Sequence, residues 1–176
     1  MKFRDDPHRL DEIDRQLLDE LQADAKISLK RVGERVGLSA PAVMERVRKL
    51  EQAGVLTGYH AQVDARRVGF DIAAFIGVAI RSPRALAEFE GWVEEVPQVL
   101  ECHHITGAHT LLLKVKVRNT GALEKLISRI RSLDGVEGTE TMVVLSTFIE
   151  RPYVPLSAGA FDDPQGNRRG VRKAAS

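Results

Sequence analysis

The tetrapeptide VGLS at residues 36–39 constrains the fold of this chain more than any other short segment. Glycine ends a helix readily because it tolerates the left-handed backbone conformation, and serine opens the next helix by capping its free N–H groups. The leucine between them is expected to enter the core. Two helices joined this closely must change direction sharply, which predicts a helix-turn-helix.

Apolar residues recur at helical spacing on both sides of this turn. Three helices are predicted, with Asp11, Ser28 and Ser39 as their N-caps. Their apolar stripes are Ile13, Leu17, Leu18 and Leu21; Val32 and Val36; and Val43, Val47 and Leu50. Gly54 is expected to end the third helix, and residues 55–64 to form an extended connector.

The second half of the chain has a pattern typical of strands that alternate with helices. Strands are predicted at 70–80, 99–106, 111–117 and 138–149, and helices at 83–95 and 121–133. The order βαββαβ is that of a ferredoxin-like unit, an antiparallel sheet with both helices on one face. The predicted fold class is therefore α+β, a helix-turn-helix followed by a ferredoxin-like domain.

These patterns divide the chain into four segments. Residues 1–54 are expected to form the helix-turn-helix domain, 55–67 a connecting strand or linker, and 68–150 the ferredoxin-like domain. Residues 151–176 have no hydrophobic period, and they end in a basic run at 167–173. This composition predicts a partly disordered tail that is either inert or adds non-specific affinity for DNA.

Composition excludes several classes of protein. The formal net charge of +1 argues against a uniformly basic chain but permits a local basic face. A single cysteine excludes an internal disulfide and fits a reducing compartment. The chain has no signal-like apolar start and no apolar run long enough to span a bilayer. We therefore expect a cytoplasmic protein without a membrane partner.

The third predicted helix has a polar face opposite its apolar stripe. That face carries Pro41, Ala42, Glu45, Arg48 and Lys49, with Arg46 at its edge. Small residues at the start of a helix permit close approach to base edges in the major groove, and basic residues further along can contact phosphates. Lys26, Lys30, Arg31 and Arg35 add positive charge in and before the second helix. The alternative interpretation is a helical cap with a solvated charged face.

Three segments resemble the Lrp/AsnC family of leucine- and asparagine-responsive transcriptional regulators: LDEIDRQLL at 10–18, VGLS at 36–39 and VMERVRKLEQAGVLTGY at 43–59. The resemblance extends from about residue 10 to residue 149. It implies a winged-type helix-turn-helix joined by a strand to an effector domain. It also implies homodimers that assemble into octamers or related rings, and a response to an amino acid or related small molecule.

The resemblance implies a sequence-specific regulator that binds double-stranded DNA. The residues expected at DNA are Ser39, Pro41, Ala42, Glu45, Arg46, Arg48, Lys49 and Lys30. A two-fold dimer would present paired recognition helices to a pseudo-palindromic site. We expect Arg46→Ala to weaken operator binding with little change in folding.

In the family, the turn between the second and third strands carries a Gly-x-x-Asp pattern beside the effector. Here the turn is GAHT at 107–110, so the neutral Thr110 stands where the family has aspartate. This departure makes ordinary amino-acid sensing doubtful unless Glu101 or Glu140 supplies the missing charge. The predicted effector residues are Gly107, Ala108, His109, Thr110, Thr139 and Thr141, although simple strand propensity also explains the last two.

The segment ECHHITGAHT at 101–110 contains the only cysteine and three of the five histidines. On a strand, Cys102 and His104 would share one face and His103 would point to the other. The spacing matches no usual metal motif, and no nucleophile with an orienting partner is evident, so we predict no metal, no cofactor and no catalytic residue. The simplest alternative is a strand with a buried thiol and histidines that are partly exposed or at a subunit interface.

Two other functions remain open from the sequence. One is an enzyme built on the ferredoxin-like half, which leaves the helix-turn-helix unexplained. The other is an architectural, nucleoid-type protein that binds DNA without an effector, which the altered turn at residues 107–110 favours.

Overall fold

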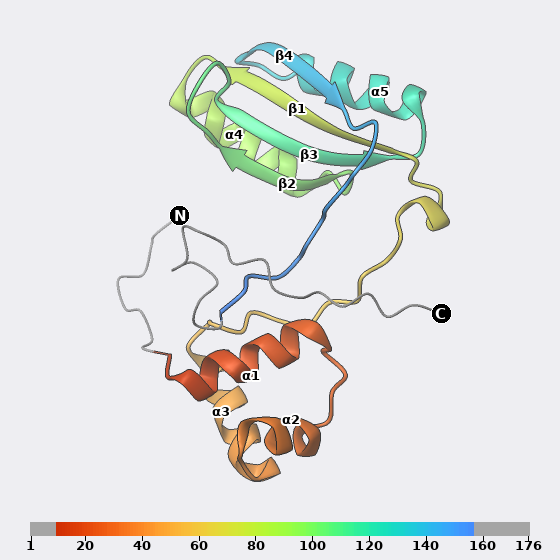
Figure 1. The fold of residues 1–176 in the computed structure, drawn as a ribbon. Helices are drawn as coiled ribbons and strands as arrows, with labels where there is room; N and C mark the ends of the chain where they lie inside the picture. The colour runs from red at the N-terminus through yellow and green to blue at the C-terminus, as the bar shows by residue number, and fades with distance from the viewer. Residues whose placement is uncertain (1–9, 157–176) are drawn as a thin grey trace, which may run out of the picture. The chain divides into compact units, whose positions relative to one another are not determined.

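The structure of the protein is a computed structural model that describes residues 10–156. These residues form two compact units (Figure 1): a helical unit of residues 10–61 with 151–156, and an effector unit of residues 62–150. The basic run predicted at 167–173 lies outside the described residues. No helix in the described range 10–156 has the length and apolar character needed to cross a membrane.

The helical unit contains α1 (Glu12–Ala23), α2 (Leu29–Val36) and α3 (Ala40–Gln52). All three predicted N-caps are confirmed: Asp11, Ser28 and Ser39 each accept a hydrogen bond from a backbone N–H in the first turn of their helix. Gly37 ends α2 in the left-handed conformation, with φ of 71°. Because these signals act over three or four residues, the local sequence was sufficient to predict them.

The core of the helical unit is formed by the predicted apolar stripes. Its buried side chains are Leu17, Leu18, Leu21, Val32, Val43, Val47 and Leu50. Asp14 is the one polar or charged residue among the described residues that is also buried. Since a buried carboxylate requires partners, its contacts are described with the site below.

The segment 151–156 folds back onto the helical unit, which the prediction of a tail at 151–176 did not anticipate. The side-chain amide of Gln22 donates to the Val154 carbonyl and accepts from the Val154 N–H, both at 2.9 Å. The Leu156 N–H donates to the Asp19 carboxylate at 3.1 Å. The Leu156 side chain packs against the helical core. These contacts join residues more than 130 positions apart, so no local pattern predicts them.

The connector, predicted as a strand or a linker, is a linker. Residues 55–65 contain no strand, and a short 3-10 helix follows at Arg66–Val68. The helical unit has three helices and no β-hairpin among its described residues, so the wing implied by the resemblance is not formed there. An extended segment becomes a strand only when another segment pairs with its N–H and C=O groups, and no described segment of the chain does so here.

The effector unit has the predicted βαββαβ order: β1 (Ile72–Ile80), α4 (Pro83–Glu94), β2 (Val99–His104), β3 (Leu111–Val117), α5 (Thr120–Arg131) and β4 (Val136–Val143). The strands form one antiparallel sheet in the order β2-β3-β1-β4. Both helices cover the same face of this sheet (Figure 1). The prediction of a ferredoxin-like domain is confirmed.

The last strand is shorter than predicted because its partner begins late. Val143 of β4 pairs with Ala74 of β1, and the Val144 N–H donates to the Ala73 carbonyl. Later residues would have to pair with the chain before Ile72, which has turned away through the 3-10 helix. The predicted strand at 138–149 therefore ends at Val143.

The two faces of the sheet differ. The helix-covered face carries the buried side chains of the core, including Ile76, Val78, Leu111 and Leu113. The alternate residues of β1 and β3, among them Phe75, Gly77, Leu112, Lys114 and Lys116, lie on the opposite face. No described helix covers this open face.

Candidate DNA interface and effector site

The turn between α2 and α3 is held by a close backbone approach at Gly33. The Leu38 N–H donates to the Gly33 carbonyl at 2.9 Å. A Cβ on residue 33 would lie 2.3 Å from the Leu38 carbonyl oxygen, a distance that no side chain tolerates. The role of Gly33 could not be predicted from the sequence, because a single glycine within a helical pattern gives no sign of what it contacts. It fixes the angle at which α3 leaves the turn.

The predicted DNA face of α3 is exposed to solvent. Pro41, Glu45, Arg48 and Lys49 are exposed, and Ala42 is half-buried. The opposite side of the helix carries the buried Val43, Val47 and Leu50. Ser39 lies at the start of this helix, where its Oγ accepts from the Ala42 N–H at 3.4 Å. Its side chain therefore caps α3.

The charges on this face are paired with one another. The Glu45 carboxylate accepts from Arg48 Nε at 3.1 Å and from Arg48 Nη2 at 2.9 Å, and Lys49 Nζ lies 3.9 Å from it. The hydrogen bond from Arg48 holds the pKa of Glu45 below its usual range. The pair is exposed and therefore weakly held, so Arg48 can exchange Glu45 for a phosphate or a base at little cost.

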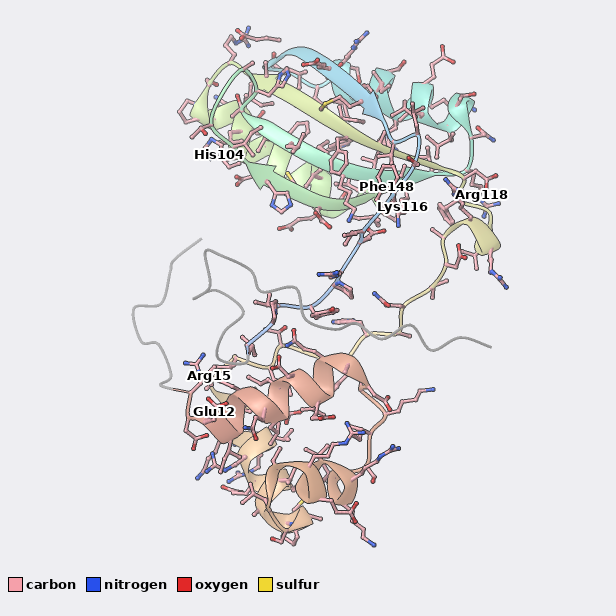
Figure 2. All side chains as sticks on the ribbon, viewed as in Figure 1. Glu12, Arg15, His104, Lys116, Arg118 and Phe148 are labelled. Carbon is pink, nitrogen blue, oxygen red and sulfur yellow. The ribbon has the colours of Figure 1, made fainter. Side chains whose placement is uncertain are left out.

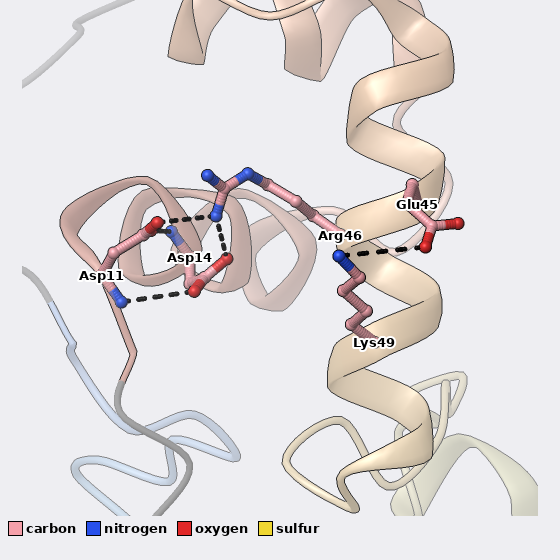
Figure 3. Close-up of polar contacts among 5 residues, drawn as sticks. All are labelled: Asp11, Asp14, Glu45, Arg46 and Lys49. Carbon is pink, nitrogen blue, oxygen red and sulfur yellow. Dashed lines mark hydrogen bonds and ion pairs between the residues drawn. The ribbon is translucent and has the colours of Figure 1, made fainter.

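Arg46 points away from this face, toward the first turn of α1 (Figure 3). Its Nη1 lies 2.7 Å from Asp11 Oδ2 and 2.7 Å from Asp14 Oδ1. These two aspartates form the capping box of α1, in which each side chain accepts from the backbone N–H of the other. Arg46 thus joins the middle of α3 to the start of α1 and neutralises the buried Asp14.

The basic residues of α2 also include one that is paired within the unit and two that are accessible. Arg35 pairs with Glu20 of α1, which places it in the scaffold of the unit. Lys30 and Arg31 are exposed and make no ion pair with any residue in the described range. Lys30, Arg31, Arg48 and Lys49 are therefore the cations of α2 and α3 that are accessible to a phosphate backbone.

In the effector unit, the hydroxyl of Thr110 accepts a hydrogen bond from the main chain. The Thr110 N–H donates to the Val78 carbonyl at 2.9 Å, and its Oγ1 accepts from the Ile80 N–H at 3.0 Å. The Ile80 N–H needs this acceptor because the pairing of β1 with β4 shifts register between Ala79 and Ile80. Thr110 therefore satisfies main-chain groups of β1 at the end of the sheet.

His109, the preceding residue, lies on the open face of the sheet. A Cβ at Gly77 would lie 2.4 Å from Cδ2 of the His109 ring, so the ring occupies the space that a side chain on β1 would fill. His109 Nε2 is 2.7 Å from Glu140 Oε2. The ring is 21% exposed, and its Nδ1 is buried without a hydrogen-bond partner among the described residues. Gly107 and Ala108 are exposed in the same turn.

Thr139 and Thr141 lie on the other side of the sheet from this histidine. In the register of β1 with β4, Thr139 is opposite Val78 and Thr141 is opposite Ile76, both of the helix-covered face. Thr139 Oγ1 accepts from Arg131 Nε of α5 at 2.7 Å. The six predicted effector residues therefore do not all lie on one face of the sheet. The β4 residue beside the turn is Glu140, one of the two predicted sources of charge.

Comparison with known proteins identifies the family. A model described as the AsnC-type helix-turn-helix domain matches residues 10–51, and one described as the Lrp/AsnC ligand binding domain matches residues 73–154. The transcriptional regulator LrpA of Mycobacterium tuberculosis is 34% identical over 146 residues, which is 83% of this chain and 97% of LrpA. The chain belongs to the Lrp/AsnC family of transcriptional regulators.

Other Lrp/AsnC proteins are similar to this chain in sequence and in fold. The regulator FL11 of Pyrococcus horikoshii is 33% identical over 147 residues, covering 84% of this chain and 97% of FL11. The crystal structure of the transcriptional regulator NMB0573 of Neisseria meningitidis in complex with L-methionine has a TM-score of 0.80 at 30% identity. It covers 84% of this chain and 97% of NMB0573.

The Lrp/AsnC ligand-binding match extends to residue 154, beyond the effector unit of this chain. In the structure, residues 151–154 belong with the DNA-binding helices, because Val154 is bonded to Gln22 of α1. The sequence match and the compact units therefore divide the chain at different places. The chain passes between the two units twice, near residue 62 and near residue 150.

Three residues of β2 in this Lrp/AsnC chain, Cys102, His103 and His104, occupy the two sheet faces predicted for them. Cys102 packs against the core beneath the helices, where burial and the nearby Glu90 raise the pKa of its thiol. His103 is exposed and lies 3.2 Å from Glu101. Within residues 10–156, no group of three or more His, Cys, Asp or Glu side chains is arranged to hold a metal ion.

The open face of the effector unit carries apolar side chains beside a charged cluster. Phe75, Lys114, Lys116 and Phe148 contribute to the lining of an open hollow of about 930 Å³ over the sheet; Lys116 and Phe148 are labelled in Figure 2. Lys114 Nζ bonds Glu150 at 2.7 Å and Glu101 at 3.0 Å. The exposed large apolar residues between positions 136 and 150 are Met142, Val143, Leu145, Phe148 and Ile149.

Proposed function

We propose that this Lrp/AsnC protein binds double-stranded DNA in a sequence-specific manner through α3, with α2 beside the phosphate backbone. The observation that supports this most is the exposed polar face of α3, which lies opposite its buried stripe, together with the accessible cations of the neighbouring α2. This is the geometry in which a recognition helix enters the major groove. We propose that the protein acts in the cytoplasm.

The proposed DNA residues fall into two groups. Pro41, Ala42, Glu45, Arg48, Lys49 and Lys30 form the contact surface. Ser39 and Arg46 hold α3 in position, because the first caps the helix and the second binds two carboxylates of α1. This assignment changes the expectation for Arg46→Ala, which we now expect to act through folding.

We propose that a second copy of the chain covers the open face of the sheet. Phe148 is 95% exposed and Leu145 is 91% exposed, and exposed apolar residues that gather on one face commonly mark an interface. A two-fold dimer would place two recognition helices about 34 Å apart, or a multiple of this, on one side of the duplex. Further assembly into an octamer or ring is proposed from the family resemblance.

The dimer is tested by sedimentation of the intact protein. Phe148→Asp places a charge in the proposed interface and is expected to shift the population toward monomer. Arg84→Asp, an equally drastic change on the exposed surface of α4, should leave the oligomer unchanged. If Phe148→Asp also leaves the oligomer unchanged, a different surface forms the dimer.

We propose that the effector is a small molecule. An amino acid fits this role if Glu140 replaces the family's aspartate as the anchor for its ammonium group. The N. meningitidis relative binds L-methionine, and Glu140 lies beside the turn in this chain. A carboxylate can hold an ammonium group by a charge-assisted hydrogen bond. A thermal-shift screen with amino acids tests this, because a ligand that prefers the folded state raises its stability.

A second function is favoured by the structure of the altered turn. Thr110 uses its hydroxyl oxygen within the sheet, and His109 already occupies the carboxylate of Glu140. Both observations favour an architectural protein that binds DNA without an effector. Footprinting with and without amino acids separates the two functions: a regulator protects a discrete palindrome that an amino acid alters, and an architectural protein gives an extended, phased pattern that amino acids leave unchanged.

The DNA surface is tested by measuring affinity for the selected site at several salt concentrations. Loss of a phosphate contact is expected to reduce the slope of log K against log salt by about one. Lys30→Ala and Lys49→Ala should each do so. Arg84→Ala, which removes an exposed cation from the effector unit, serves as the matched control and should not.

A further inference from the structure

Met44 is an exposed apolar side chain on the proposed recognition helix. It is 58% exposed. Among the described residues of α1, α2 and α3, it is the one large apolar side chain that is exposed. A single exposed apolar residue is ordinary on a protein surface. Its exposure therefore indicates a function only if its position on α3 is a functional one.

That position is within the face assigned to DNA. Residues three and four apart are neighbours on a helix surface, so Met44 lies next to Pro41 on one side and Arg48 on the other. All three are exposed, while Val43 and Val47 beside them are buried. Pro41 and Met44 therefore form a small apolar surface at the start of a face whose remainder is charged.

The major groove offers one apolar feature to such a surface. Of the four bases, only thymine presents a methyl group there, and proteins read it by apolar contact. The other polar groups at the edges of the bases are hydrogen-bond donors and acceptors. A thioether is only a weak acceptor and a proline ring offers neither group, so both satisfy them poorly. The flexible, unbranched methionine side chain adapts its shape to the surface it contacts.

We propose that Met44 reads a thymine methyl group in each half-site of the operator. This inference rests on the proposed binding of DNA by α3. Neighbouring Arg48, once released from Glu45, can bind a phosphate or a guanine next to it. Met44 thus specifies a position by contact with a methyl group, and its charged neighbours supply affinity.

The test replaces thymine by deoxyuridine, which lacks the methyl group and pairs identically with adenine. The operator is first obtained by selection from random duplex DNA with the full chain. Each thymine is then replaced in turn, and Kd is measured by fluorescence anisotropy at constant salt. Burial of one methyl group corresponds to about a fourfold change in affinity. At one thymine of each half-site, we expect the replacement to weaken wild-type binding by about this factor.

The variants assign the effect to the side chain. Met44→Ala should bind the thymine and deoxyuridine operators equally, and Met44→Leu should keep most of the discrimination. Gln52→Ala, at the exposed end of the same helix, should discriminate as the wild type does. Since Met44 is exposed, its substitution leaves the core intact.

Two results would overturn the inference while leaving the proposed function in place. One is a selected operator at which no thymine replacement affects wild-type binding. The other is a thymine preference that Met44→Ala retains. If selection recovers no preferred sequence at all, sequence-specific binding itself fails, and the assignment of Met44 fails with it.

Discussion

Arg46 and Asp14 form an ion pair, with 2.7 Å between Nη1 and Oδ1, that links the second half of the helix-turn-helix to the start of the first helix (Figure 3). Asp14 is buried, and its side chain also accepts from the Asp11 N–H as part of the capping box. One arginine thereby connects a helix cap, a buried charge and the orientation of the proposed recognition helix. Arg46 therefore belongs to the scaffold, although the charge pattern of α3 alone suggests that it contacts DNA.

Arg46→Ala is expected to destabilise the helical unit by about 1–3 kcal/mol, because it leaves the buried Asp14 carboxylate without its cation. Hydrogen exchange of the α1 and α3 amides measures this locally. Arg48→Ala, which removes an exposed pair on the same helix, should leave that exchange unchanged. A fully folded Arg46→Ala protein with weakened DNA binding would instead restore the original prediction that Arg46 contacts DNA.

Acid is expected to weaken the helical unit through Asp11. The pKa of the Asp11 carboxyl lies below its usual range, first because of the hydrogen bond from the Asp14 N–H and then because of Arg46. A depressed pKa stabilises the folded state above the pKa of the unfolded chain, about 4. This contribution is lost as the pH falls through the folded value. Urea unfolding between neutral pH and about pH 3 should show this loss.

Asp11→Asn separates the charge from the cap. Asparagine remains a good N-cap, so the variant should be less stable than the wild type at neutral pH and should lose less stability in acid. Asp134→Asn, at an exposed site of the effector unit, is the control. Parallel acid profiles for Asp11→Asn and the wild type would exclude Asp11 as the source of the acid sensitivity.

Leu156→Ala is expected to destabilise the helical unit by about 1–3 kcal/mol, below the full range for a completely buried leucine because Leu156 is only partly buried. Val154→Ala is the matched control, since the Val154 side chain is 59% exposed and its contacts to Gln22 use the backbone alone. Hydrogen exchange of α1 measures both variants. Equal protection in both variants and the wild type would show that the Leu156 side chain contributes nothing to the stability of the helical unit.

Gly77→Ala is expected to displace the His109 ring, because the new Cβ would lie 2.4 Å from Cδ2. Displacement breaks the contact with Glu140 and exposes the imidazole. Modification by diethyl pyrocarbonate, located by mass spectrometry, should become several times faster at His109. Gly91→Ala, with nothing near its Cβ, should leave the rate unchanged. An unaltered rate in Gly77→Ala would mean that the ring does not rest on Gly77.

Thr110→Val is expected to reduce the stability of the effector unit by about 1 kcal/mol, because it leaves the Ile80 N–H without its acceptor. Thr110→Asp keeps an acceptor and adds the charge typical of the family. If the neutral side chain limits amino-acid sensing, Thr110→Asp should increase amino-acid binding in calorimetric titration. Unaltered binding in Thr110→Asp would show that the threonine does not set the response.

Local chemistry explains why much of the fold was predictable. The caps at Asp11, Ser28 and Ser39 and the left-handed Gly37 act within one turn of a helix, so a short stretch of sequence contains both partners. The order of strands and helices follows from the period of the apolar residues. The exposed face of α3 was predictable for the same reason, since the buried stripe defines its opposite side.

The parts that were not predicted depend on partners distant in sequence. Arg46 meets Asp14 across 32 positions, His109 meets Glu140 across 31, and Gln22 meets Val154 across 132. The face assigned to Thr139 and Thr141 depended on the register of β4 against β1, and a shift of one residue exchanges the two faces of a strand.

The sequence by itself determined the elements of this protein and their order, because helix caps and hydrophobic periods are local. The resemblance to the Lrp/AsnC family came from the motifs at 10–18, 36–39 and 43–59. Only the tertiary structure decided which charges are available for a ligand. Arg46 and Arg35 are held by carboxylates of α1, while Lys30 and Lys49 remain accessible on the surface. A charged side chain binds the nearest opposite charge in space, and that distance is set only when the helices pack.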